Sequence, residues 1–233
     1  MLTTALALFL AHLLADYPLQ NSWIIANKKK PEAMAAHIGI VFVLSFLALK
    51  GEIVPALTLS ALHLAIDLIK THYAPERLWA YIAALLAHYV TIVGILWFWG
   101  DLGLLWPDAT IWMQYILAVS AGLILCVFAG GPAIGLLMAD FQNMQHAGLP
   151  AAGRMIGLLE RALIYLMVLV GQPAGIGFLI AAKSILRFDT ASKDLRASEY
   201  VIIGTLASFG WALLISYATL SLITITGIDP ASP

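Results

Sequence analysis

The amino-acid sequence predicts an all-α protein, a polytopic transmembrane helical bundle of about eight spans. Hydrophobic residues make up 62% of the 233 residues and charged residues only 11%, whereas a soluble domain carries about 25% charged residues. The apolar residues fall into runs that approach the length of a membrane span. Lysine and arginine gather in every second connection between these runs, as alternating spans require.

The first half of the chain contains four of the predicted spans, separated by short polar turns. The first run is short, and it reaches about 20 residues only if residues 16–20 belong to its inner end, which Pro18 marks. Pro31 stands at a position typical of a helix start. Trp23 and its neighbours suit a short segment at the membrane interface. The predicted spans are residues 2–15, 31–49, 53–69 and 78–99.

The second half contains the other four spans, at residues 111–129, 155–170, 174–186 and 200–225. Gly130, Gly131 and Pro132 are expected to break the fifth span, leaving residues 133–144 as a short amphipathic segment at the membrane surface. We interpret the chain as one integral membrane domain, residues 1–233. Residues 1–99 form a His/Asp-bearing half, and residues 111–226 a Glu/Arg/Lys-bearing half.

The placement of positive charge predicts the topology. The loops after the first, third, fifth and seventh spans carry the basic residues, and Lys183 and Arg187 lie at a helix end on the same side. The opposite loops hold only Lys50. The positive-inside rule therefore places both termini outside the cytoplasm of a multi-pass protein of the inner (plasma) membrane. The basic loop residues are Lys28, Lys29, Lys30, Lys70, Arg77, Arg154, Lys193 and Arg196.

The overall composition indicates which classes of partner the protein has. The net charge of −1 gives no general attraction to nucleic acid, and the bilayer is the expected surrounding. Cys126 is the single cysteine, so an intramolecular disulfide is excluded.

Two matching pairs, His12 with Asp16 and His63 with Asp67, are the clearest candidates for chemistry. Each pair has a spacing of four residues, which places both side chains on one face of a helix. His37 and His88 add an imidazole from the second and fourth spans. At about 1.5 Å per residue, the four histidines lie roughly 7–15 Å from the cytoplasmic surface. We expect them to share one depth in the inner leaflet.

Imidazole nitrogens and carboxylate oxygens are ligands for borderline divalent metals, of which zinc is the first expectation. The predicted metal-binding residues are His12, Asp16, His37, His63, Asp67 and His88. Each aspartate could instead orient its histidine from outside the ligand set. A proton relay without metal is a third alternative, and hydrogen bonds that only fasten helices are a fourth. His72 and His146 fall in predicted loops, where we expect them to be solvated.

A second set of charged residues predicts an anion-binding wall. Glu160 and Arg161 fall inside the sixth span, while Lys183 and Arg187 form a cationic pair four residues apart at the inner end of the seventh. Arg161 is the best candidate for bidentate binding of a phosphate or carboxylate. The alternative is that Lys183 and Arg187 extend to lipid headgroups.

Together these residues resemble a family of bacterial and archaeal membrane proteins, the domain-of-unknown-function 3307 family, along nearly the whole chain. The first half carries the resemblance in His12, Asp16, Leu19-Gln20, Lys28–Lys30, His37, His63, Asp67 and Lys70. The second half carries it in Gly153-Arg154, Ile156-Gly157, Glu160-Arg161, Ala181–Ser184, Arg187-Phe188, Glu199-Tyr200 and Gly204-Thr205. The resemblance implies a membrane location. The first half is also similar, in residue type and placement, to membrane-bound metal-dependent hydrolases.

Three functions follow from the sequence. The first is a metal-dependent hydrolase of a lipid-linked or anionic substrate, in which a metal activates water. In it Asp16 or Asp67 serves as base, and Glu160, Arg161, Lys183 and Arg187 bind the substrate. The second is an ion- or proton-coupled transporter or channel that uses the same residues as its path. The third is a membrane scaffold with a structural polar site.

Overall fold

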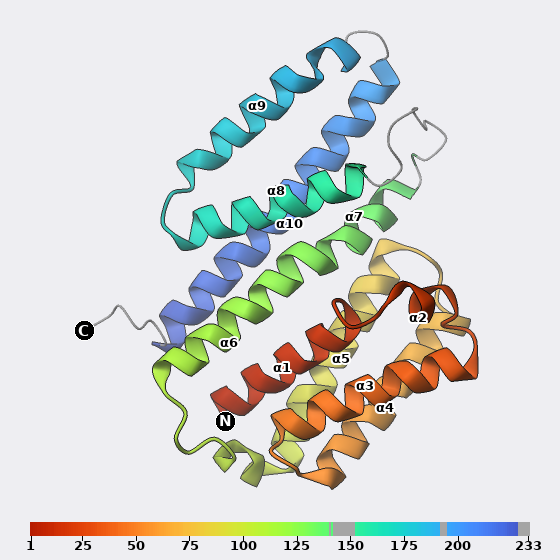
Figure 1. The fold of residues 1–233 in the computed structure, drawn as a ribbon, viewed down its shortest axis with the longest axis vertical. Helices are drawn as coiled ribbons and strands as arrows, with labels where there is room; N and C mark the ends of the chain where they lie inside the picture. Colours follow the sequence, from red (N-terminus) through yellow and green to blue (C-terminus); the bar gives the residue numbers. More distant parts are fainter. Residues whose placement is uncertain (140, 142–151, 192–194, 228–233) are drawn as a thin grey trace. The chain divides into compact units, whose positions relative to one another are not determined.

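The fold is helical throughout the part of the chain that the structure describes. A computed structural model describes residues 1–139, 141, 152–191 and 195–227, without the side chains of residues 186–191 and 195–197. Within these ranges no strand occurs, so the predicted all-α class is confirmed (Figure 1). Predictions that concern His146 and Lys193 fall outside the described residues.

The helices follow the predicted runs closely, and they divide into two compact units, residues 1–124 with 223–233, and residues 125–222. Unit 1 contains α1 (Leu2–Asp16), α2 (Ser22–Ala26), α3 (Pro31–Ala48), α4 (Ile53–His72), α5 (Leu78–Phe98), the 3₁₀ helix η1 (Gly100–Leu104) and α6 (Ile111–Ile124). Unit 2 contains the π-helix η2 (Leu125–Ala129), α7 (Gly130–Met138), α8 (Ala152–Leu169), α9 (Ala174–Ala191) and most of α10 (Leu195–Thr226).

In unit 1, α1 packs against three of the other α-helices. It contacts α3, α5 and α6, while α4 contacts both α3 and α5 (Figure 1). Ala7, Ala11 and Ala15 recur every four residues on α1 and are buried in the main apolar core. Small residues on one face allow neighbouring helices to approach closely. The side chains of His12 and Asp16 on the same helix are only 2% and 15% exposed, so they also lie largely in the interior.

Local sequence explains where the helices of unit 1 begin and end. The first helix ends at Asp16 because Pro18 disfavours helical geometry in the residue before it. Asn21 caps α2 by accepting a hydrogen bond from the backbone N–H of Ile24 at 2.9 Å. The turn between α3 and α4 places Lys50 and Gly51 at φ 50° and 97°. Glycine adopts this left-handed region without steric cost.

Unit 2 departs from the sequence prediction at Gly130–Pro132. The predicted break is absent, because the chain remains helical from Ile111 to Met138 through the π-helix η2. Pro132 lies inside this continuous helix and has no backbone N–H to donate, and Arg161 instead donates to the carbonyl oxygen of Val127, five residues earlier. The expectation of a separate surface segment beginning at residue 133 is therefore wrong.

Fewer helices than predicted have the length and composition of a membrane span. In the described part of the chain, five helices are long and apolar enough to cross a membrane. They are Pro31–Ala48, Ile53–His72, Leu78–Phe98, Ile111–Met138 and Ser198–Thr226. The apolar helices Leu2–Asp16 and Ala174–Ile185 are shorter, and α8 carries buried charge at Glu160 and Arg161. A count of about eight is not confirmed.

Candidate metal centre

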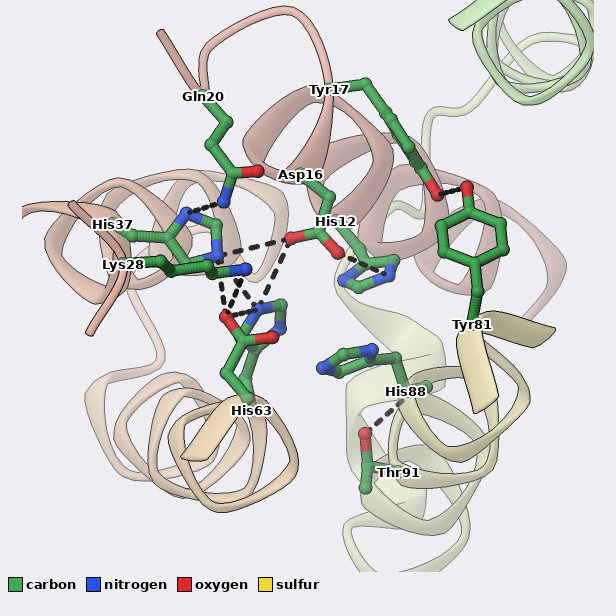
Figure 2. A network of polar contacts seen from close by, with 11 residues as sticks. His12, Asp16, Tyr17, Gln20, Lys28, His37, His63, Tyr81, His88 and Thr91 are labelled. Atoms are coloured by element: carbon green, nitrogen blue, oxygen red, sulfur yellow. Dashed lines mark hydrogen bonds and ion pairs between the residues drawn. The ribbon is translucent and has the colours of Figure 1, made fainter. Parts of the chain in front are cut away.

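The six predicted His and Asp residues come from four helices of unit 1 and meet in its interior. Figure 2 shows the side chains of His12 and Asp16 from α1, His37 from α3, His63 from α4 and His88 from α5 converging on one region. Asp67 lies one turn after His63 on α4 and is 1% exposed. The four histidines are each at most 3% exposed. Buried polar groups of this kind need partners, since desolvation of an unpaired polar group is costly.

The first group of donors surrounds the Nε2 atoms of His37 and His63. These two nitrogens lie 3.2 Å apart. Asp16 Oδ1 lies 3.3 Å from each of them, and Asp67 Oδ2 lies 3.2 Å from His37 Nε2 and 3.7 Å from His63 Nε2. Each of the two carboxylates therefore presents an oxygen to this pair of imidazole nitrogens.

Gln20 contacts the other ring nitrogen of His37. Its amide lies 3.3 Å from His37 Nδ1. With the amide oxygen on that side, it accepts hydrogen bonds from His37 Nδ1 and from Lys28 Nζ at 3.2 Å, while the amide nitrogen donates to the backbone oxygen of Asp16. This orientation satisfies all the groups around Gln20. A proton on Nδ1 leaves Nε2 of neutral His37 as a lone pair facing two carboxylate oxygens.

Lys28 provides a positive charge beside this group. Its Nζ lies 2.9 Å from Asp67 Oδ2, and the lysine side chain is 20% exposed. The ammonium reaches the centre from the segment between α2 and α3. Asp67 therefore interacts with a tethered cation on one side and with the two imidazoles on the other.

A second group of donors lies around His12 and His88. His12 Nε2 is 3.7 Å from Asp16 Oδ2, and the His12 and His88 rings have centroids 4.8 Å apart (Figure 2). Among the described residues, neither His12 Nε2 nor His88 Nε2 has a hydrogen-bond partner. The centroid of the His88 ring is also 4.1 Å from that of His63.

Three sets of residues have the proximity that a metal ion requires. They are His12 with Asp16 and His88, Asp16 with His37 and His63, and His63 with Asp67 and His88. Within each set the ligand atoms lie within 4.8 Å of one another. Nitrogen and oxygen donors of this type suit zinc and other borderline divalent metals. The residues present therefore fit a divalent ion, although they do not identify which one.

The polar residues predicted in the second half form separate contacts within unit 2. Arg161 is 5% exposed. It donates from Nε and Nη2 to the backbone oxygen of Val127, at 3.1 and 2.8 Å, and from Nη1 to Ser208 Oγ at 3.2 Å. Lys183 Nζ lies 2.7 Å from Glu160 Oε2. Arg187 lies on α9, and its side chain is outside the described part.

The contacts of Arg161 explain two glycines of unit 2. A Cβ atom on Gly130 would lie 2.9 Å from Arg161 Cδ and 2.8 Å from the Trp211 ring, and one on Gly157 would lie 3.1 Å from Arg161 Nη1. Both positions provide the room that the guanidinium occupies. Because Val127 belongs to η2, the arginine satisfies a carbonyl where the regular hydrogen-bond pattern changes.

Sequence reasoning did not identify Lys28 and Gln20 as members of the centre. Both residues were noted only as parts of short motifs, and Lys28 is one of three consecutive lysines. Their contacts depend on how residues 17–30 fold back across the ends of α1 and α3, which has no periodic signal in the sequence. In the sequence, the only sign that Gln20 and Lys28 belong to the centre is that they lie near Asp16 and His37.

A comparison with protein families identifies the segment that contains this centre. Residues 4–116 match the family model described as "Protein of unknown function (DUF3307)". This segment of the chain belongs to the DUF3307 family. The DUF3307 match contains all six His and Asp residues as well as Gln20 and Lys28, and the second-half motifs lie beyond it. Neither the curated proteins nor the solved structures gave a match.

Proposed function

We propose that this DUF3307 protein is a membrane-embedded, divalent-metal-dependent hydrolase of a lipid-linked or other amphipathic anionic substrate. The observation that supports it most is the convergence of acceptor atoms in unit 1. Asp16 Oδ1 and Asp67 Oδ2 both lie close to His37 Nε2, at 3.3 and 3.2 Å. Acceptors that face one another in a buried space need a proton or a cation between them.

The proposed location is the inner membrane, with both termini outside the cytoplasm. Five long apolar helices support membrane insertion, and the alternation of basic loops supports the orientation. In this arrangement Lys28, Lys29 and Lys30 face the cytoplasmic headgroups, and the His/Asp centre lies a short distance deeper. A hydrolytic site at that depth is reached by substrates that reside in the bilayer.

Asp16, His37, His63 and Asp67 are the residues that would hold the ion, which we propose to be zinc. A divalent ion bound there supplies Lewis-acid chemistry and activates water for hydrolysis. Gln20 keeps His37 in the ligand tautomer, which is the role usually taken by a group outside the ligand set. An oxygen of Asp67 that does not bind the ion would be available to accept a proton.

The proposed substrate class rests on a groove beside the centre. The groove has a volume of about 580 Å³, and Lys28–Lys30 line it together with apolar side chains of α3 and α4. Met34, Ile38, Leu64 and Leu68 belong to its apolar part. A basic end joined to an apolar wall complements an anionic headgroup joined to an acyl chain. Lys28 contributes both to this groove and to the centre.

Glu160, Arg161, Lys183 and Arg187 were the anion-binding residues proposed from the sequence. The donors of Arg161 bind Val127 and Ser208 in unit 2, and Lys183 pairs with Glu160. These contacts favour a structural role for the three residues. We therefore propose the lysine-lined groove of unit 1 as the anion site.

The experiment is a hydrolysis assay on the detergent-purified protein. Long-chain phosphate and carboxylate esters are supplied with zinc, or after treatment with EDTA. We expect zinc-dependent turnover of at least one ester, its loss in His63→Ala, and its retention in Asp101→Ala, because Asp101 is exposed and does not line the groove. Equal rates in both variants would contradict the proposal.

An ion- or proton-coupled transporter is the second candidate. The buried network of four histidines and two aspartates favours it, since titratable groups inside a membrane often form proton relays. Proton flux through proteoliposomes that depends on His63 but is unchanged by EDTA would support the transporter over the hydrolase.

A further inference from the structure

The donors of the candidate metal centre do not form a single ligand shell. One set consists of Asp16, His37 and His63, and another of His12, Asp16 and His88. These two sets have only Asp16 in common. A carboxylate has two oxygens, and each can bind a different ion.

The two oxygens of Asp16 face different sets. Oδ1 lies 3.3 Å from Nε2 of both His37 and His63, whereas Oδ2 faces His12 Nε2 at 3.7 Å. Figure 2 shows the Asp16 carboxylate between His37 and His63 on one side and His12 on the other. The orientation is that of a bridging carboxylate.

The second set contains buried nitrogens that the first ion would leave unsatisfied. His12 Nε2 and His88 Nε2 lack hydrogen-bond partners among the described residues, and both side chains are 3% exposed. A proton on His88 Nε2 would have no acceptor there, and a lone pair would have no donor. A cation bound by both nitrogens and by Asp16 Oδ2 satisfies all three atoms at once.

The remaining set, His63 with Asp67 and His88, competes with this arrangement. It uses His63 from the first set and His88 from the second. An ion bound by His63, Asp67 and His88 would take one ligand from each of the other two sets, so neither of those sets could be complete. His12 would then bind no ion. The choice between the arrangements therefore changes the number of bound ions.

We propose that the centre is dinuclear. Asp16 bridges one divalent ion bound with His37 and His63 to a second divalent ion bound with His12 and His88. The inference rests on the proposed metal site and adds a second ion to it. Paired ions about 3.5–4 Å apart are typical of enzymes that hydrolyse phosphate esters. This favours a phosphate ester as the anionic substrate.

The experiment measures zinc per chain in the detergent-purified protein after equilibration with zinc and removal of free ions. We expect two ions per chain in the wild-type protein and in His72→Gln, and one in His88→Gln and His12→Gln. X-ray absorption at the zinc edge should show zinc–zinc scattering at about 3.5–4 Å in the wild type. His88→Gln should abolish it.

The possible outcomes separate the two proposals. One ion per chain in the wild type, or two ions retained in His88→Gln, would overturn the dinuclear centre and leave the proposed hydrolase intact. No bound ion in the wild type would overturn both. The wild-type measurement decides the question even if the His12 or His88 variants fail to fold.

Discussion

Replacing Asp16 by Asn should weaken metal binding more than any other single isosteric change in the centre. Asp16 is shared by the two ligand sets that we propose to bind ions together, and its oxygens lie 3.3 to 3.7 Å from three different imidazoles. Asn preserves the shape but removes the negative charge. Loss of a group that only supports a ligand weakens metal binding about 10–100-fold.

Loss of a ligand that is shared by two sets should weaken metal binding by more than that. We expect at least about 100-fold weaker binding, or about 2.8 kcal/mol at 1.4 kcal/mol per tenfold change. The affinity is measured by competition with a zinc chelator in detergent, and Asp101→Asn serves as the control because Asp101 is exposed.

Thermal stability gives an independent measurement of the same effect. At a zinc concentration of 100 times the wild-type Kd, binding stabilises the folded protein by about 2.7 kcal/mol. A variant with a 100-fold higher Kd would gain only about 0.4 kcal/mol under the same conditions. An Asp16→Asn protein whose zinc affinity lies within threefold of wild type would refute the bridging role.

Three further predictions concern other parts of the chain. Lys28→Met should raise zinc affinity about tenfold, because the ammonium 2.9 Å from Asp67 Oδ2 competes with an ion for that oxygen. The zinc affinity is measured against a chelator, and weaker zinc binding in Lys28→Met would contradict this reasoning. Single cysteines at Lys29 and Asp108 should be labelled from opposite membrane faces, and labelling from one face would end the proposed topology. Arg161→Lys should lower thermal stability in detergent by about 1.5–3 kcal/mol, because the bidentate contact to η2 is lost; an unchanged melting temperature would contradict that role.

The apolar runs predicted most of the fold because helix formation and membrane insertion depend on local composition. The helices α3, α4 and α5 match their predicted runs to within a few residues. The number of spans was less predictable. The first run ends at Asp16, so α1 remains shorter than a typical span, and α8 carries two buried charged residues.

The break expected at Gly130–Pro132 shows a limit of local propensity. Glycine and proline disfavour a helix in isolation, yet tertiary contacts preserve it here. Arg161 and Trp211 both donate hydrogen bonds to carbonyls of η2. Partners distant in the sequence therefore stabilise the irregular segment, and no local pattern near Gly130 indicates them.

The composition of the centre was largely predictable, whereas its internal arrangement was not. Spacing of four residues placed His12 with Asp16 and His63 with Asp67 on common faces, and the predicted topology gave them similar depths. The division into overlapping sets depends on which oxygen of Asp16 faces which imidazole. That orientation follows from the packing of α1 against α3 and α5, which the sequence does not specify.

The most direct test of the account is the zinc content of the purified protein by elemental analysis. Wild-type protein and His72→Ala should contain zinc in stoichiometric amounts, because His72 is exposed and its Nδ1 contacts the backbone oxygen of Leu68 rather than the centre. His63→Ala should lose most of it, since His63 belongs to two of the three ligand sets. Equal zinc content in the two variants, or a wild-type protein without zinc or another divalent metal, would contradict the metal centre.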